Sequence, residues 1–194
     1  MLYPEVCPLC STCGVAPCQV CGSKVKAPGG VASAPPGVDG LFSLTLYEDL
    51  GAQLVRAIKF QNRRDSLRWA AAEIAGQVGM FSFDVVTWVP SSKASLRHRG
   101  FEPASLVADQ VARRLNVDSA GLLSRRRDDV GQRTKTRRDR LDGPALRLRR
   151  SVPGPAVLLI DDVVTTGATL TTAAGVLRDG GARFIYAGCL ARKT

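Results

Sequence analysis

Residues 157–169 restrict the possible folds of this chain more than any other stretch, because they combine an apolar run with a polar turn. They read Val-Leu-Leu-Ile-Asp-Asp-Val-Val-Thr-Thr-Gly-Ala-Thr and follow a Pro-Gly-Pro at 153–155. Four consecutive apolar residues after such a turn predict a strand buried on both faces, as in a parallel sheet. From Leu170 onward the apolar residues have helical spacing. We therefore expect a strand over 157–160, then a polar turn, then a helix N-terminus.

The turn has the residue types of an anion site. The first backbone N–H groups of a helix have no acceptor within the helix, and the helix dipole favours negative charge there. Gly167 can adopt backbone angles closed to other residues, which lets the main chain approach a phosphate closely. The hydroxyl groups of Thr165, Thr166 and Thr169 are further donors. We interpret the turn as a phosphate site; the alternative is an ordinary corner between a strand and a helix.

Asp161 and Asp162, which directly follow the predicted strand, suit a different part of the same ligand. Carboxylates repel a phosphate, so their chemistry fits neutral hydroxyl groups or a metal ion. A ligand that carries a phosphate beside a polyol, such as a ribose 5-phosphate, satisfies both the acidic pair and the turn. The alternative is an acidic pair that is simply solvated.

Residues 157–169 resemble the phosphoribosyl-pyrophosphate (PRPP) binding motif of type I phosphoribosyltransferases, and all thirteen positions agree. The resemblance implies that the acidic pair holds the ribose hydroxyls and that the turn at 165–169 holds the 5′-phosphate. It also implies that Asp161 and Asp162 are the catalytic residues. The PRPP-binding residues implied by this motif are Asp161, Asp162, Val163, Val164, Thr165, Thr166, Gly167, Ala168 and Thr169.

A second strand–loop–helix unit precedes the motif. Residues 83–90 predict a buried strand that Pro90 ends, and the apolar spacing of 103–115 predicts a helix. The loop between them is rich in hydroxyl groups and cations, and ligands of open parallel sheets gather at the carboxyl ends of the strands. We expect this loop to face the pyrophosphate end of the ligand; its candidate binding residues are Ser91, Ser92, Lys93 and Arg99. His98, the only histidine, is interpreted as an exposed loop residue and not as an acid–base catalyst.

Five cysteines lie within the first 21 residues. Cys7 and Cys10 form one Cys-x-x-Cys pair and Cys18 and Cys21 form another, which is the spacing at which two thiolates share a tetrahedral zinc ion. A disulfide cluster is the competing interpretation, but nothing in the sequence suggests export and the cytosol keeps thiols reduced. We predict a structural Zn²⁺ site, with Cys13 as an alternate ligand in place of Cys10 or Cys18.

The rest of the sequence predicts one α/β domain. Residues 23–38 are rich in Ala, Pro, Gly and Ser and are interpreted as a linker between a zinc knuckle at 1–22 and a domain at 39–194. Further predicted elements are a half-buried strand at 41–47, amphipathic helices at 48–60 and 65–79, and short strands at 117–123 and 183–190. Together they predict a doubly wound, mainly parallel sheet of type I phosphoribosyltransferase topology.

The net charge of +10 is concentrated in one segment. Residues 124–150 hold eleven Lys and Arg against four Asp, a net charge of +7. Such a segment attracts polyanions such as pyrophosphate or nucleic acid, although it has no aromatic residue for base stacking; the alternative is a solvated basic loop. No apolar run approaches the roughly 20 residues of a membrane helix, and the N-terminus has no signal pattern. We therefore expect a cytoplasmic protein without membrane insertion.

The order of these pieces is similar to that of the ComF family, named for competence protein F, whose members join a four-cysteine knuckle to a phosphoribosyltransferase-type domain. Besides the two motifs, the similarity rests on Ala-Ile-Lys-Phe at 57–60, on Arg-His-Arg-Gly-Phe at 97–101, and on Arg125 with Gln132. The chain departs from the family at Glu102-Pro103, where Asn-Gln is usual, and in the loop after Gln132.

The resemblance implies two classes of function. The first is an enzyme that binds PRPP with Mg²⁺ and transfers phosphoribose to a nitrogen nucleophile, while a loop over 124–143 closes over the site. The second is a non-catalytic PRPP sensor or scaffold linked to DNA uptake, competence or recombination, with single-stranded DNA and a helicase-like protein as partners. A nucleobase salvage phosphoribosyltransferase is a third alternative.

Overall fold

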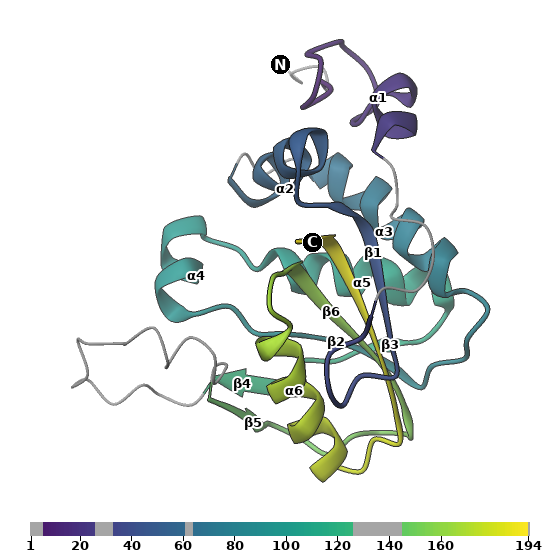
Figure 1. Cartoon of the computed structure of the whole chain (residues 1–194), viewed down its shortest axis with the longest axis vertical. Helices are drawn as coiled ribbons and strands as arrows, with labels where there is room; N and C mark the ends of the chain where they lie inside the picture. The colour runs from purple at the N-terminus through teal and green to yellow at the C-terminus, as the bar shows by residue number, and fades with distance from the viewer. Residues whose placement is uncertain (1–5, 26–32, 61–63, 126–144, 194) are drawn as a thin grey trace.

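The computed structural model describes residues 6–25, 33–60, 64–125 and 145–193 (Figure 1). At its centre lies a five-stranded sheet of order β1-β7-β6-β2-β3, in which every neighbouring pair of strands is parallel. The strands are β1 (Gly40–Leu46), β2 (Val85–Trp88), β3 (Asp118–Ser119), β6 (Ala156–Val164) and β7 (Phe184–Arg192). A separate antiparallel pair consists of β4 (Leu123–Arg125) and β5 (Leu146–Leu148).

Helices cover both faces of the parallel sheet (Figure 1). On one face lie α2 (Asp49–Phe60), α3 (Arg64–Val78) and α5 (Pro103–Leu115), which share a core cluster with Leu158 and Ile160 of β6. On the other face lie α6 (Ala168–Asp179) and the β4–β5 pair, packed with Val157 and Leu159. Because successive side chains of a strand point to opposite faces, the apolar run at 157–160 contributes two residues to each core. The predicted fold class, doubly wound and mainly parallel α/β, is confirmed.

Strand β6 is longer than the sequence predicted, and it includes the acidic pair. We expected the strand to end at Ile160, but its pairing with β7 continues through Asp161 opposite Cys189 to Val164 opposite Arg192. Its pairing with β2 ends earlier, where the Val89 N–H donates to the carbonyl oxygen of Ile160. The next residue of that chain is Pro90, which has no backbone N–H to donate. The acidic pair therefore lies on a strand that is held on one side only, beside the point where β2 ends.

A short helix, α4 (Lys93–Arg99), replaces most of the predicted loop at 91–101. The Oγ of Ser92 accepts the Ser95 N–H at 3.1 Å, which caps the first turn. Gly100 adopts a φ of +73°, and its N–H donates to the carbonyl oxygen of Leu96, which ends the helix as a left-handed glycine commonly does. The loop prediction was wrong because these two local caps stabilise a turn that has no buried apolar face.

Strand β1 was predicted to be half-buried, but both of its faces are covered. The polar residues Ser43 and Thr45 are each only 5% exposed. The hydroxyl of Ser43 donates to the carbonyl oxygen of Thr45 at 2.6 Å, so it is satisfied without water. Alternation of apolar and polar residues therefore did not indicate a solvent-facing side here.

Residues 33–39, which lead into β1, pack against α6. The carboxylate of Asp39 accepts hydrogen bonds from Nη2 of Arg178 at 3.0 Å and from the N–H of Ile185 at 2.6 Å. Nε of Arg178 also donates to the carbonyl oxygen of Gly37 at 3.1 Å. This segment includes part of the stretch that the sequence analysis interpreted as a linker, and it is tied to both α6 and β7.

The remaining element boundaries differ mainly near residue 120. Helices α2 and α3 begin and end within one residue of the predicted bounds. The single strand predicted at 117–123 is wrong, because β3 and β4 are separate. The chain leaves the sheet after Ser119, and the Leu122 N–H then donates to the buried Oγ1 of Thr87.

No helix in the described ranges is long and apolar enough to cross a membrane. The N-terminal helix α1 (Gln19–Lys24) lies beside α3, with Gly22 against the ring of Trp69.

Candidate functional site

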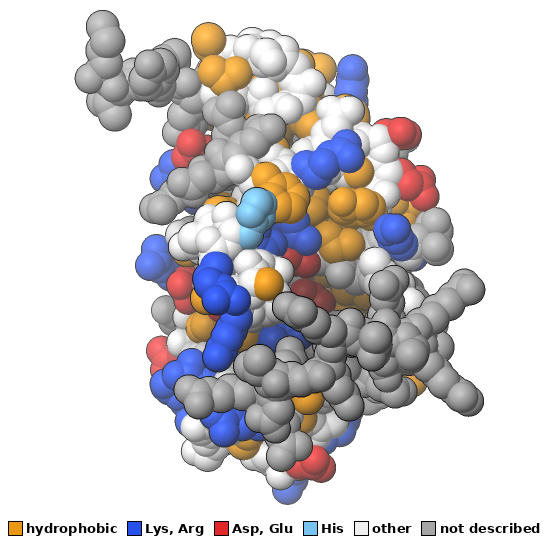
Figure 2. All heavy atoms as spheres, turned by 90° about the vertical axis from the view of Figure 1, so that its left-hand side faces the viewer, with side chains coloured by type: hydrophobic (Ala, Val, Ile, Leu, Met, Phe, Trp, Pro, Cys, Tyr) orange, Lys and Arg blue, Asp and Glu red, His pale blue; other side chains and the backbone are white. Residues whose placement is uncertain are grey.

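A pocket of about 260 Å³ opens at the carboxyl edge of the sheet, where β2 and β6 end. It is lined by Lys59, Val89, Pro90, Ser91, Ser92, Ser95, Arg99, Ala104, Arg125, Asp161, Asp162, Val163 and Thr169. Figure 2 shows this side of the molecule, with acidic side chains set in a hollow among Lys and Arg side chains. Segments that are distant in the sequence therefore bring both signs of charge into one pocket.

Asp162 is held between two cations. Its Oδ2 lies 2.9 Å from Nζ of Lys59 near the end of α2, and 3.6 Å from Nη1 of Arg99 at the end of α4. The side chains of Asp162 and Lys59 are 20% and 18% exposed, so this ion pair is largely shielded from water. Lys59 was not predicted as a site residue from the sequence; its place in the Ala-Ile-Lys-Phe stretch at 57–60 was the one available signal.

The carboxyl group of Asp161 is partly buried in the wall of the pocket and resists ionisation. Burial, together with the neighbouring Asp162 carboxylate, raises the pKa of Asp161 to about 7, although the Asp162 N–H and the cations of Lys59 and Arg125 oppose the rise. The Asp162 N–H donates to Oδ1 of Asp161 at 2.8 Å. Asp161 therefore exchanges its proton close to neutral pH.

Arg99 ties α4 to the acidic strand. Its Nη2 donates to Oγ of Ser91 at 3.0 Å, while its Nη1 faces Asp162. The side chain is only 9% exposed, and its buried Nε has no hydrogen-bond partner among the described residues. Because a buried N–H without an acceptor costs free energy, a ligand oxygen at this position would be stabilised.

Glu102 and Arg125 fix the chain that follows β2. The Glu102 carboxylate accepts hydrogen bonds from Nε1 of Trp88 at 2.7 Å and from the backbone N–H of Ser91 at 2.5 Å. Nε of Arg125 donates to the carbonyl oxygen of Pro90 at 2.8 Å. The N–H of Ser91 is thus already bonded to a protein acceptor. Glu102, which stands where the ComF family usually has Asn, has a defined place beside the site.

The predicted phosphate turn joins β6 to α6. Gly167 is the N-cap of α6 and has a φ of +76°, a left-handed conformation that glycine adopts without strain. A Cβ at this position would lie 2.7 Å from Cβ of Pro35, so the glycine also accommodates residue 35, which the sequence did not predict. Thr165 and Thr166 are exposed. Within the described ranges, the backbone N–H groups of Thr165, Thr166 and Gly167 donate to no protein acceptor.

The structure brings some of the sequence-predicted site residues together and leaves others outside the pocket. Those that line it are Ser91, Ser92, Arg99, Asp161, Asp162, Val163 and Thr169; those that do not are Lys93, Val164, Thr165, Thr166, Gly167 and Ala168. Val164 is buried in the core and Lys93 is exposed. Lys59 and Ser95 were missed as site residues, and Arg125 was noted only for its charge and its family resemblance. Most of the loop expected to close over the site falls at 126–144, outside the described residues.

His98 lies on the surface of α4, as the sequence analysis expected. Its side chain is exposed, and the centroid of its ring lies 6.4 Å from that of Phe60 at the end of α2. The imidazole does not line the pocket. The geometry therefore gives this residue no contact with the acidic pair.

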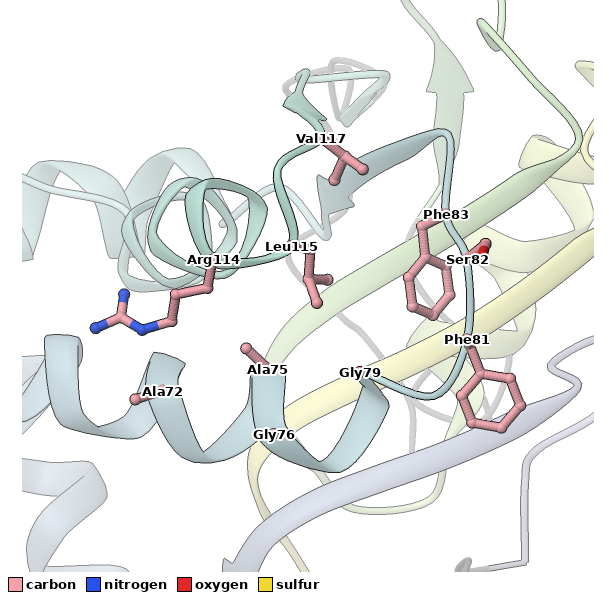
Figure 3. A pocket seen from close by; sticks show the side chains of 10 residues that line it. All are labelled: Ala72, Ala75, Gly76, Gly79, Phe81, Ser82, Phe83, Arg114, Leu115 and Val117. Carbon is pink, nitrogen blue, oxygen red and sulfur yellow. The ribbon is translucent and has the colours of Figure 1, made fainter.

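A larger groove, of about 760 Å³, lies at the opposite edge of the sheet (Figure 3). The C-terminal halves of α3 and α5 line it, together with residues 79–83, which lead into β2. Its one charged lining residue is Arg114, whose guanidinium already donates to the carbonyl oxygens of Arg68 and Gln110. Despite its size, this groove offers no grouping of charges comparable to that in the pocket at the carboxyl edge.

The four cysteines of the two Cys-x-x-Cys pairs come together near the N-terminus. All four Sγ atoms lie within 4.8 Å of one another, so the group could hold a metal ion; its members are Cys7, Cys10, Cys18 and Cys21. Hydrogen bonds lower the pKa of Cys10 to about 6; the largest contribution is from the hydroxyl of Thr12, 3.2 Å from Sγ of Cys10, and Cys21 and Cys7 add to it. Cys13 is exposed, pairs with Val6 in a β-bridge, and lies outside this group.

Comparison with known proteins first defines the class. Residues 102–194, just under half of the chain, match the family model of the phosphoribosyl transferase domain. This match, together with the parallel sheet and the β6–turn–α6 unit, identifies the fold as that of type I phosphoribosyltransferases. The chain therefore has the fold of a phosphoribosyl transferase domain.

Over nearly its whole length, the chain is similar to proteins named DNA utilization protein YhgH. It is 29% identical to the Salmonella typhimurium protein in an alignment 205 positions long, which covers 95% of this chain and 90% of the relative. It is 26% identical to the Escherichia coli protein in an alignment 201 positions long, which covers 95% of this chain and 84% of the relative. The similarity thus extends beyond the transferase domain.

Among solved structures, the chain is similar to two enzymes of nucleotide metabolism. With the allosteric regulatory enzyme of purine biosynthesis, the TM-score is 0.46 at 21% identity, and the match spans 70% of this chain but only 30% of that one. With adenine phosphoribosyltransferase from Saccharomyces cerevisiae, the TM-score is 0.47 at 13% identity, and the match covers 89% of each chain.

The raised pKa of Asp161 predicts a stability that falls as pH rises from about 4 to about 7, because in this window the unfolded chain has lost a proton that the folded protein retains. Asp161→Asn removes this penalty. We expect the variant to be more stable than the wild type at about pH 8, by roughly 2–4 kcal/mol, with the difference shrinking towards zero near pH 4. Urea unfolding at both pH values measures the effect, and Asp179→Asn, at an exposed acid of α6, is the control. A difference that does not depend on pH would contradict the prediction.

Proposed function

We propose that this chain is a ComF-type protein whose pocket at the carboxyl edge binds PRPP together with Mg²⁺. The observation that carries the proposal is that an acidic pair on β6, cations from α2, α4 and β4, and the first turn of α6 meet in one pocket. A sugar with phosphates at both ends and hydroxyls between them matches these groups: the phosphates suit the cations and the first turn of α6, and the hydroxyls suit the acidic pair. The match of 102–194 to the phosphoribosyl transferase domain supports the same ligand.

Each part of PRPP has its own partners in this proposal. The 5′-phosphate binds at the N-terminus of α6, on the N–H groups and hydroxyls of residues 165–169. The ribose hydroxyls bind the carboxylates at 161–162. The pyrophosphate lies against residues 91–93, where the Nε of Arg99 donates to one of its oxygens and Lys59 adds a second positive charge.

We propose that the same arrangement supports a transferase reaction at this pocket. A nitrogen nucleophile forms a bond to C1 of the ribose as the bond from C1 to the pyrophosphate oxygen breaks, and the electron pair leaves with pyrophosphate. The carboxylates of Asp161 and Asp162 stabilise the positive charge that develops on the ribose, and Arg99 stabilises the departing negative charge. Bound Mg²⁺ supplies further neutralisation of the diphosphate. The N–H proton of the nucleophile passes to solvent.

Calorimetric titration with Mg²⁺-PRPP tests the binding proposal. We expect the wild type to bind, and Thr165→Glu to bind at least about tenfold more weakly, because a carboxylate at this exposed position repels the 5′-phosphate. Ser151→Glu adds the same charge at an exposed position before β6, at the opposite edge of the sheet, and should bind like the wild type. Absence of binding by the wild type would overturn the proposal.

Incubation of the protein with Mg²⁺-PRPP and a panel of nucleobases tests the reaction. Pyrophosphate release identifies an enzyme, and release with purines alone identifies a salvage enzyme. Binding without release identifies a PRPP sensor.

We further propose that the clustered cysteines hold a structural zinc ion. Four thiolates at this separation match the tetrahedral coordination that zinc takes in structural sites. Helix α1 carries Cys21, and the adjacent Gly22 lies against the ring of Trp69 in α3. A metal ion in the cluster would therefore hold the N-terminal region in contact with the domain.

Metal analysis of purified variants tests the zinc proposal. We expect about one zinc ion per chain in the wild type and in Cys13→Ser, and none in Cys7→Ser, because a structural site needs all four thiolates. Loss of zinc in Cys7→Ser should also change the fluorescence of Trp69, since its ring packs on α1. Zinc that is lost from Cys13→Ser but retained by Cys7→Ser would contradict the assignment of ligands.

Binding of single-stranded DNA is a second candidate function, which two observations favour. The relatives above are named DNA utilization proteins. Arg147, Arg149 and Arg150 are exposed at and just after β5, within the basic segment. We propose that these side chains contact DNA phosphates in DNA uptake or recombination, together with a helicase-like partner.

Fluorescence anisotropy with single-stranded DNA at several salt concentrations tests this second candidate. Replacing Arg147, Arg149 and Arg150 with Ala should weaken binding and reduce the slope of log affinity against log salt by about 2, because three phosphate contacts are lost. Asp161→Asn should retain the wild-type affinity. Affinity that does not change with salt would contradict a charge-driven mode of binding.

A further inference from the structure

We propose that Lys59 is a built-in counter-ion of the acidic pair, so that a divalent cation and a diphosphate-bearing ligand bind this pocket together and only weakly alone. The proposal rests on the proposed function, because it specifies how a PRPP pocket admits its two charged components. It gives Lys59 a role in ligand selection that the sequence motif does not contain.

The position of the Lys59 ammonium group blocks a metal ion from Oδ2 of Asp162. Nζ lies 2.9 Å from Oδ2 of Asp162, and Arg99 approaches the same oxygen to 3.6 Å. A Mg²⁺ ion binds carboxylate oxygens at about 2.0–2.1 Å, so at this oxygen it would lie very close to the ammonium group. Like charges at such a distance repel strongly. While Lys59 stays in place, the acidic pair is neutralised from within the protein.

Lys59 is able to change partners. It is the second-last residue of α2, and within the described ranges its one ion pair is with Asp162. An ammonium group on a flexible four-carbon stem can turn towards another acceptor with little distortion of the helix. Arg99 is more restricted, because Ser91 holds its Nη2 and its side chain is only 9% exposed.

An anion in the pocket can draw Lys59 away from Asp162. The buried Nε of Arg99 lacks an acceptor among the described residues, and Arg125 lines the same pocket. A diphosphate between these side chains would offer oxygen acceptors to all three cations. Once Lys59 pairs with the diphosphate, Oδ2 of Asp162 is free for a divalent cation or for the ribose hydroxyls.

The two ligands are therefore coupled through one ion pair. The diphosphate removes the cation that blocks the acidic pair, and the divalent cation removes the carboxylate that holds Lys59. Either ligand alone must break the Lys59–Asp162 pair. A divalent cation alone would leave Lys59 without its carboxylate, and a diphosphate alone would leave Asp162 without Lys59. Because such coupling is reciprocal, each ligand raises the affinity of the pocket for the other by the same factor.

Binding of Mn²⁺, measured by the electron paramagnetic resonance signal of the free ion, tests the cation side. At about pH 8 we expect Mn²⁺ alone to bind Lys59→Gln at least about tenfold more tightly than the wild type, because the competing ammonium group is gone. Arg56→Gln removes the same charge from an exposed position of the same helix and should bind Mn²⁺ as weakly as the wild type. Equal Mn²⁺ affinity of Lys59→Gln and the wild type would overturn the proposal.

Asp162→Asn tests the anion side, and it keeps the proposal testable if Lys59→Gln does not fold. Without the carboxylate, Lys59 and Arg99 are free for an anion. We expect inorganic pyrophosphate, in the absence of divalent cations, to bind Asp162→Asn at least about tenfold more tightly than the wild type. Unchanged or weaker pyrophosphate binding would overturn the proposal.

A third titration, of the wild type with Mn²⁺ and PRPP together, separates this proposal from the proposed function. If this mixture does not bind while Lys59→Gln gains affinity for Mn²⁺, the counter-ion role of Lys59 is supported and the ligand is not PRPP. If the mixture binds but Mn²⁺ alone binds the wild type and Lys59→Gln equally, the PRPP site stands and the counter-ion proposal fails.

Discussion

The pairing of β6 with β7 beyond the end of β2 is the constraint on which the site depends. Because β7 continues to Arg192, the residues on both sides of Asp162 stay paired with it, Asp161 opposite Cys189 and Val163 opposite Ala191, and the chain does not become a loop there. On the other side, β2 has already ended at Trp88, and the chain that leaves it supplies the serines of the pocket. One strand edge thus presents two carboxylates at fixed positions opposite a segment rich in donors.

Charge balance in the pocket follows from this geometry. Asp161 is partly desolvated and lies next to a second carboxylate, and these two effects together raise its pKa. The repulsion is offset by cations from elements far apart in the chain, chiefly Lys59 of α2 and Arg99 of α4. The same cations are the groups that a phosphate ligand needs. In the ligand-free site, Lys59 and Arg99 therefore take the place of a metal ion beside Asp162, and the Asp162 carboxylate takes the place of an anion beside these cations.

The sequence predicted best those features that local pattern determines. Apolar spacing placed α5 at 103–115, where the structure has it, and predicted a strand buried on both faces from residue 157. Spacing also grouped the four cysteines that meet in space. The extension of β6 through Asp161 was not visible, because the length of a strand depends on its partner. The contacts of Lys59 and Glu102 were equally hidden, since each is made to a residue on another element.

The contact between Pro35 and Gly167 has a consequence for how chains of this kind can vary in length. Residue 35 lies against the turn after β6, and four residues later Asp39 is bonded to Arg178 and Ile185. Both ends of this short interval are thus fixed to different parts of the domain. An insertion or deletion inside it would have to displace either the start of the sheet or the turn before α6. Length variation among related proteins is therefore expected to fall outside 35–39, which makes this interval a reference point for aligning distant sequences.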